Sequence, residues 1–288
     1  MNNLRHQATS SRILYFGTHN TFSLPPLLAL LRAGQRVAAV VIPESSEQST
    51  LGANAIKLLP TARNDTIVAS ARTHGIPVWT LSHLPDTLEF ELLVVSCFPN
   101  RLPQLLLNRA TIAALNIHPS RLPAYRGPAP VFWQLRDGIR EIGVTLHHMT
   151  SQIDAGNIVA QTDVTLPVGI SGPDADELLA RAGANILLTT IQSGDFSGRS
   201  QGNLKSYQSW PHTQDWSVPT SWPVLHAFNF MRGVAEWGQS FILLSQPKPL
   251  TARAATDFTH GKSIPGAVRP SRSGRHEVGF ADGWLQVC

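Results

Sequence analysis

The stretch NIHPSRLPAYRG, residues 116–127, places two polar side chains one residue apart at the end of an apolar run. Residues i and i+2 of a strand point to the same face, roughly 6.5 to 7 Å apart, so Asn116 and His118 should face one cavity. The Asn amide offers N–H donors for a developing oxyanion, and an imidazole can accept or pass a proton near neutral pH. The pair therefore predicts chemistry that passes through a tetrahedral intermediate.

Asp154 is the candidate for the carboxylate that this pair lacks. It lies between two predicted strands, and Gly156 suits a turn that returns the chain to the sheet. A carboxylate there could hold the imidazole in one tautomer and stabilise its charged form. No G-x-S-x-G elbow surrounds Ser120, so the three groups favour direct transfer between two bound reactants without a covalent intermediate.

Strand and helix patterns alternate through the first two thirds of the chain. Apolar runs predict strands at 12–17, 36–43, 76–81, 91–98, 113–118, 143–149 and 157–166, with helical segments between most of them and a long helix at 174–192. This order predicts an α/β fold with a Rossmann-like, mostly parallel sheet and right-handed crossovers. Ligands bind beyond the carboxyl ends of such strands, which is where Pro119 ends the strand of Asn116 and His118.

The pattern predicts four parts of the chain. Residues 1–11 are a flexible N-terminal extension, 12–195 a catalytic domain, 196–215 a linker rich in Gly, Ser and Gln, and 216–288 a small C-terminal domain. Short extended runs broken by Gly, Pro and Ser predict an OB-like β-barrel in the last part. His147 and His148 lie on a predicted strand and face opposite ways, so at most one can reach the cavity.

Composition limits the class of protein. The chain has 288 residues, 42% of them hydrophobic and 15% charged, which is enough for one or two cores. Cys97 and Cys288 are its two cysteines, which excludes a disulfide framework and favours a cytoplasmic location. No signal peptide or apolar run of membrane-spanning length is present, and no spacing suggests a metal site. We therefore expect no membrane partner and no metal.

Positive charge is concentrated near the C-terminus. Residues 1–204 hold 15 Lys and Arg against 14 Asp and Glu, whereas residues 205–288 hold 8 against 5. A basic tail is compatible with an anionic partner such as RNA. The segment from Pro43 to Asp65 has a charge of −1, which is poorly suited to phosphate contacts.

The quoted motifs together resemble a known family. NIHPSRLPAYRGPAP, followed by GVTLHHM and IDAGNIVAQ, resembles the formyltransferases that use 10-formyltetrahydrofolate, and within them the branch that formylates methionyl-tRNA. The likeness covers residues 12 to about 195 well and the tail more loosely. It implies the formyltransferase fold and 10-formyltetrahydrofolate as co-substrate. It also implies Asn116, His118 and Asp154 as the catalytic residues.

The same resemblance implies that Ser120, Arg121, Leu122 and Pro123 form a loop against the folate. Three departures stand beside it: SCFPNRLP at 96–103, Arg121 where the family usually has Leu, and a short tail that implies a truncated barrel. The basic tail favours initiator methionyl-tRNA as the acceptor, whereas the acidic segment favours a small amine such as an amino sugar or a peptide-like metabolite. Hydrolysis with water as acceptor, and binding without turnover, stay open as alternatives. The oligomeric state is not predicted.

Overall fold

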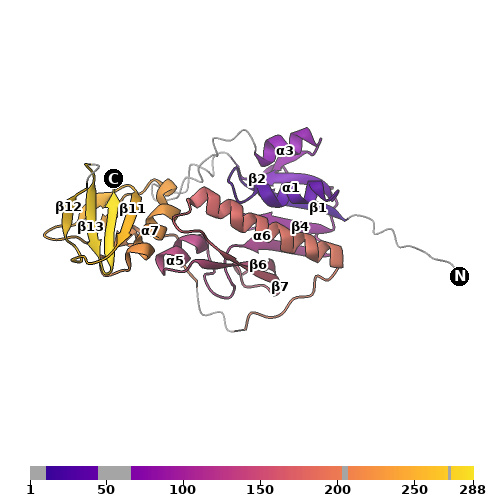
Figure 1. The fold of residues 1–288 in the computed structure, drawn as a ribbon. Coiled ribbons are helices and arrows are strands. Elements are labelled where there is room, and N and C mark those ends of the chain that lie inside the picture. Colours follow the sequence, from indigo (N-terminus) through magenta and orange to yellow (C-terminus); the bar gives the residue numbers. More distant parts are fainter. Residues whose placement is uncertain (1–10, 45–65, 203–206, 272–273) are drawn as a thin grey trace.

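A computed structural model describes residues 11–44, 66–202, 207–271 and 274–288. The predicted extension at 1–11, apart from its last residue, and most of the acidic segment from Pro43 to Asp65 lie outside the described residues. Figure 1 shows a large α/β part and a smaller C-terminal part with helix α7 (Val224–Gly233) between them. Among the described residues, no helix combines the length and the apolar character needed to cross a membrane.

Seven strands form the main sheet in the order β3-β2-β1-β4-β5-β6-β7. Their bounds are β1 (Arg12–Gly17), β2 (Arg36–Ile42), β3 (Val78–Thr80), β4 (Leu92–Ser96), β5 (Ala113–His118), β6 (Glu141–His148) and β7 (Ile158–Thr165). All pairs from β3 to β5 are parallel, and β6 and β7 are antiparallel additions. The predicted mostly parallel α/β sheet is therefore confirmed.

Helices cover the sheet because its central strands are apolar on both faces. Every residue of β4 is buried, as expected of an internal parallel strand. The helices of this part are α1 (Leu24–Arg32), α3 (Ile67–Thr73), α4 (Gln104–Leu107), α5 (Pro130–Arg136) and α6 (Gly172–Ser193). The long α6 begins at Ser171, whose hydroxyl accepts the Asp174 N–H, and ends at Gly194 with a left-handed φ of 69°.

The C-terminal part contains two sheets. The first has β8 (Ser217–Val218), β9 (Phe241–Leu243) and β10 (Leu250–Ala252), and the second has β11 (Ala255–His260), β12 (Val268–Pro270), β13 (His276–Phe280) and β14 (Gly283–Val287). The second sheet is antiparallel throughout. In the described residues the two sheets do not join into one closed barrel, so the predicted OB-like barrel is not confirmed. These strands have only two to six residues. Such short segments do not determine which strands pair, so the sequence alone cannot show whether the sheets close into a barrel.

The two parts share one apolar core. Phe132 of α5 lies 5.1 Å from Trp216 and 5.3 Å from Phe230 of α7, measured between ring centroids. The same buried cluster continues to Phe280 in β13. At the junction His226 of α7 donates from Nε2 to a backbone carbonyl of α5 at 2.8 Å. These contacts hold α5, and the loop that precedes it, against the C-terminal part.

Candidate functional site

A row of polar side chains crosses one face of the sheet where β5 ends. Asn116 lies opposite His147 in the β5–β6 pair, and His118 lies opposite Thr145. The alternate residues point toward α6, because a Cβ on its Gly183 would lie only 2.4 Å from Ile117. The polar row is therefore on the face of the sheet away from α6.

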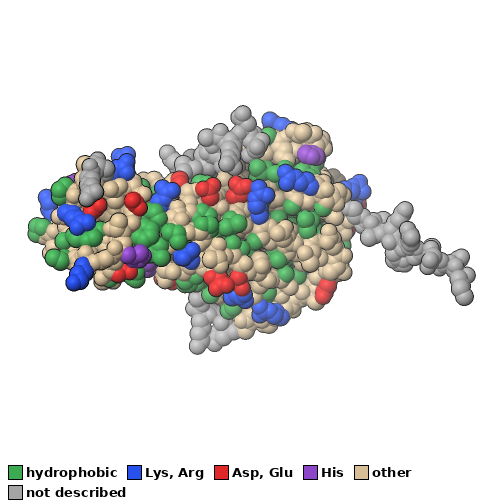
Figure 2. Space-filling view, viewed as in Figure 1, with side chains coloured by type: hydrophobic (Ala, Val, Ile, Leu, Met, Phe, Trp, Pro, Cys, Tyr) green, Lys and Arg blue, Asp and Glu red, His purple; other side chains and the backbone are tan. Residues whose placement is uncertain are grey.

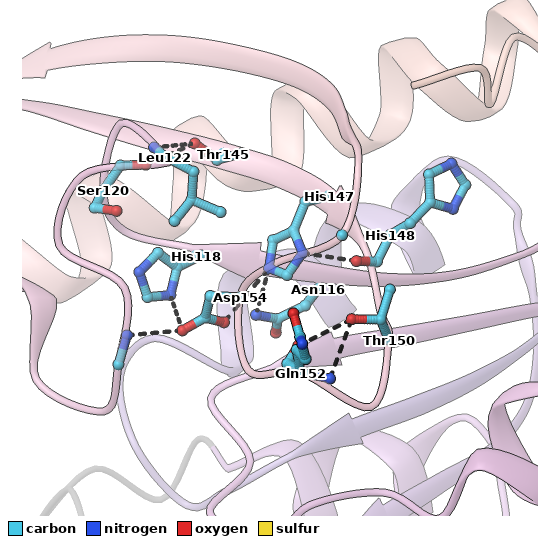
Figure 3. A network of polar contacts seen from close by, with 12 residues as sticks. Asn116, His118, Ser120, Leu122, Thr145, His147, His148, Thr150, Gln152 and Asp154 are labelled. Carbon is cyan, nitrogen blue, oxygen red and sulfur yellow. Dashed lines mark hydrogen bonds and ion pairs between the residues drawn. The ribbon is translucent and has the colours of Figure 1, made fainter. Parts of the chain in front are cut away.

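Asp154 lies between two imidazole rings of this row (Figure 3). Its Oδ2 is 3.6 Å from His118 Nδ1 and accepts the Gly127 N–H at 2.9 Å, while its Oδ1 is 3.6 Å from His147 Nε2. Asp154 has a φ of 52°, in the left-handed region that Asp tolerates better than most residues. The structure thus brings together the three residues that the sequence singles out.

The tautomer of neutral His118 follows from its second partner. His118 Nε2 lies 3.0 Å from the Tyr125 carbonyl oxygen, which can only accept, so Nε2 carries the hydrogen. The basic nitrogen is then Nδ1, beside Asp154. Burial lowers the pKa of His118 below 6.5, although the Asp154 carboxylate and the Tyr125 carbonyl act in the opposite direction. The ring is therefore a neutral base at pH 7.

The Asp154 carboxylate is the fixed negative charge of the site. Burial on its own would raise its pKa, but His118 and the Gly127 N–H hold that pKa well below its usual range. A proton placed on His118 Nδ1 would therefore face a carboxylate that stays ionised. This arrangement stabilises an imidazolium without removing its proton.

His147 and His148 face opposite sides, as the sequence predicts. The His148 ring turns away from the site and donates to the Phe196 carbonyl oxygen at 2.8 Å. The His147 ring is 2% exposed and contacts both Asn116 and Asp154. From the sequence, at most one of these two histidines can face the cavity, but the sequence does not show which one.

The loop Ser120–Pro123 is anchored from within. The Ser120 hydroxyl is buried and donates to the Ala124 carbonyl at 2.7 Å, and the Leu122 N–H donates to Thr145 Oγ1 at 3.2 Å. Arg121 turns toward β7, where its Nε donates to Asp163 Oδ1 at 2.9 Å. The side chains of this loop thus fix its backbone, and the role against folate that the resemblance implies stays a prediction.

A cavity of about 490 Å³ adjoins the turn that carries Asp154. It is lined by Arg101, Arg126, Ser151, Gln152, Ile153 and Tyr207. Ile153 directly precedes Asp154, and Arg126 directly precedes the Gly127 N–H that binds Asp154. The cavity therefore offers space for a reactant next to the polar row, with two guanidinium groups and a phenol in its wall.

Two residues hold the Asp154 loop in place, and sequence reasoning missed one of them, Gln201. Gly156 passes so close to the His148 carbonyl that a Cβ would lie 1.9 Å from its oxygen. Gln201, within the predicted linker, donates from Nε2 to the Asp154 and Gly156 carbonyls at 2.9 and 2.7 Å. The Asp-x-Gly motif gave a signal for Gly156, but a glutamine in a polar segment gave none.

The cysteines do not supply a nucleophile. Both are free, and burial raises the pKa of Cys97 to about 11, with a further contribution from Asp176. Cys97 is therefore a neutral thiol at pH 7, and its Sγ accepts a hydrogen bond from Asn20 Nδ2 at 2.7 Å. Within the described ranges, no group of three or more His, Cys, Asp or Glu side chains is arranged to hold a metal ion.

Comparisons with known proteins agree with this geometry. The model of the formyl transferase family matches residues 12–190. A methionyl-tRNA formyltransferase of Staphylococcus epidermidis is 27% identical over 95% of this chain and 88% of its own length, and one of Listeria innocua is 29% identical over 91% and 85%.

Solved structures share the fold at lower identity. An N-formyltransferase from Helicobacter canadensis, in complex with folinic acid and dTDP-3-aminofucose, has a TM-score of 0.65 at 17% identity, covering 96% of this chain and 98% of that one. HypX from Aquifex aeolicus has a TM-score of 0.60 at 17% identity, and this chain spans 44% of it. The family match covers more than half of the sequence and includes the whole polar row, and the chain therefore belongs to the formyltransferase family of enzymes.

Proposed function

We propose that the protein transfers the formyl group of 10-formyltetrahydrofolate to the amino group of an acceptor, and that this acceptor is methionyl-tRNA. The observation that carries the proposal is the convergence of the Asn116 amide, the His118 imidazole and the Asp154 carboxylate at one edge of the sheet. An oxyanion donor, a neutral base and a fixed negative charge are what direct formyl transfer requires.

The reaction forms one C–N bond and breaks another. The neutral amine attacks the formyl carbon, the carbonyl electron pair moves to oxygen, and an N–H of Asn116 stabilises that oxyanion. His118 Nδ1 takes the proton that the attacking nitrogen loses, and Asp154 stabilises the imidazolium. The intermediate then collapses with cleavage of the bond between the formyl carbon and N10 of the folate, and His118 returns its proton to N10.

The folate donor is supported by the family and by the cavity beside Asp154. A structure of Aquifex aeolicus HypX in this fold group contains tetrahydrofolic acid. We place the folate in the cavity of about 490 Å³ and propose that the loop Ser120–Pro123, whose backbone is anchored, lies against it. The altered stretch 96–103 contributes Arg101 to the same wall.

Methionyl-tRNA as acceptor is supported by the named relatives, which align with the C-terminal part as well as the catalytic part. Residues 205–288 carry the excess of Lys and Arg, and Figure 2 shows such side chains spread over the C-terminal part. Phosphates of an acceptor stem would meet positive charge there.

A small amine is the second candidate acceptor. The solved N-formyltransferase with dTDP-3-aminofucose has the same fold over nearly its whole length. Hydrolysis would use the same residues with water in place of the amine.

One experiment distinguishes these acceptors. Purified protein is mixed with 10-formyltetrahydrofolate and either charged initiator tRNA, a panel of amino sugars and peptide-like amines, or no amine. We expect formyl transfer to the tRNA, decreasing about tenfold or more between roughly 50 and 200 mM salt as phosphate contacts weaken. Transfer only to a small amine, with little dependence on salt, would replace the tRNA. Release of formate at the same rate without an amine would identify a hydrolase.

A further inference from the structure

His147 stands outside the trio that the sequence singles out, yet it contacts two of its members. It lies directly opposite Asn116 in the β5–β6 pair, where cross-strand side chains approach most closely. An irregularity in the β6–β7 register falls between Leu146 and His147. Bulges of this kind re-aim side chains next to active sites.

The hydrogen bonds of His147 determine its tautomer. Nδ1 lies 2.8 Å from the His148 carbonyl oxygen, which can only accept, so Nδ1 carries the hydrogen. Nε2 of the neutral ring is then an acceptor, and the Asn116 atom 3.1 Å away is the amide nitrogen. His147 therefore fixes which end of the Asn116 amide faces it.

The fixed amide has a direct consequence for the oxyanion. One N–H of Asn116 Nδ2 is bound to His147, so the second is held in the amide plane at a fixed angle to the first. Asn116 is half-buried, whereas the His147 ring is 2% exposed and cannot turn freely. A donor that is already in position stabilises the developing negative charge without the free-energy cost of reorienting, and this lowers the barrier of the reaction.

We propose that His147 is a positioning residue that binds one N–H of Asn116 and thereby aims the other at the oxygen of the formyl group. The inference rests on the proposed function for its catalytic consequence, but the hydrogen bond itself can be measured without turnover. His118 and His147 then have different roles: His118 moves protons, and His147 orients a donor.

The kinetic test uses His147→Leu, His147→Gln and the double variant His147→Leu/Asn116→Ala. The control is His74→Leu, at an exposed position directly after helix α3. We expect His147→Leu to lower kcat about 10- to 50-fold with KM for 10-formyltetrahydrofolate within about threefold. The amide oxygen of His147→Gln can still accept from Asn116, so this variant should recover to within about fivefold of wild type. Thermal unfolding of each variant checks that it is folded.

The double variant tests whether the effect passes through Asn116. If it does, adding His147→Leu to Asn116→Ala lowers kcat by less than about twofold, because the donor is already absent. Fully multiplicative losses, or near-normal kcat in His147→Leu, would overturn the proposal.

Nitrogen-15 NMR of the wild-type protein separates this inference from the proposed function. The Asn116 side-chain resonances, assigned by their loss in Asn116→Ala, should shift in His147→Leu and return toward wild type in His147→Gln. In the neutral His147 ring the hydrogen should be on Nδ1 and not on Nε2. An Nε2–H tautomer would refute the positioning role even in an active enzyme. Correct NMR signals in a protein that transfers no formyl group would instead refute the proposed function.

Discussion

Asp154 and Asp176 are two carboxyl groups removed from bulk solvent, and their surroundings give them opposite properties. At Asp154, His118 and the Gly127 N–H outweigh burial and hold the pKa below its usual range. At Asp176, near the start of α6, burial and the like charge of Glu236 raise the pKa to about 7. Burial alone disfavours the charged form, so it is the neighbours that turn one acid into a permanent anion and leave the other partly protonated.

Mutation of the two acids should differ most in its effect on kcat. Asp154→Asn removes the charge that stabilises the His118 imidazolium, and we expect kcat to fall about a thousandfold. The matched Asp176→Asn should leave kcat within about twofold, because Asp176 contacts none of the trio. Formyl-transfer assays under saturating substrates measure both, and a mild effect of Asp154→Asn would remove the role assigned to the carboxylate.

Mutation of the partners of Asp154 should have the next largest effect on kcat. His118→Ala removes the base and Asn116→Ala removes the oxyanion donor, so each should lower kcat at least about a hundredfold while the variant still folds. Single-turnover rates and circular dichroism separate lost chemistry from lost structure. Near-normal rates in either variant would contradict the assigned chemistry.

The dependence of kcat on pH sharpens the comparison further. In the proposed mechanism His118 acts as a neutral base, and burial lowers its pKa, so the acidic limb of the profile should lie below pH 6.5. At pH 6.5 the wild type should keep more than half of its plateau rate. In Asp154→Asn the carboxylate no longer raises the His118 pKa, so the limb of the residual activity should move to still lower pH. A limb above pH 6.5 in the wild type would show that the ring is not desolvated as described.

The smallest expected effect concerns stability at Asp176. Its pKa is about 7 in the folded chain against 3.8 ordinarily, so the folded state holds an extra proton between these values and loses stability as pH rises toward 7. Asp176→Asn should therefore raise the Tm at pH 8 by about 2 to 4 °C and have less effect at pH 5. Asp154, with its lowered pKa, has the opposite sign: its stabilisation is present above about pH 3.8 and is lost in acid. Equal Tm shifts for Asp176→Asn at both pH values would contradict the raised pKa.

The main sheet and the trio can both be predicted from the sequence because both depend on the long apolar strands. Long apolar strands alternating with helices permit few topologies, and Asn116 and His118 stand together at the end of one strand. The C-terminal sheets are less predictable because their strands are short and their pairing depends on tertiary contacts. The tautomers of His118 and His147 depend on the Tyr125 and His148 carbonyls, and no residue-type pattern encodes which carbonyl an imidazole will meet.

The contacts of Gln201 have a practical meaning for anyone who trims this chain. The family match stops at residue 190, but the Asp154 turn is held by an amide at 201, and the backbone N–H of Gln208 binds the Arg126 carbonyl beside Gly127. A fragment cut at the family boundary would keep every residue of the trio and lose the braces on either side of its acid. The smallest piece worth expressing for chemistry is therefore longer than the one that homology outlines.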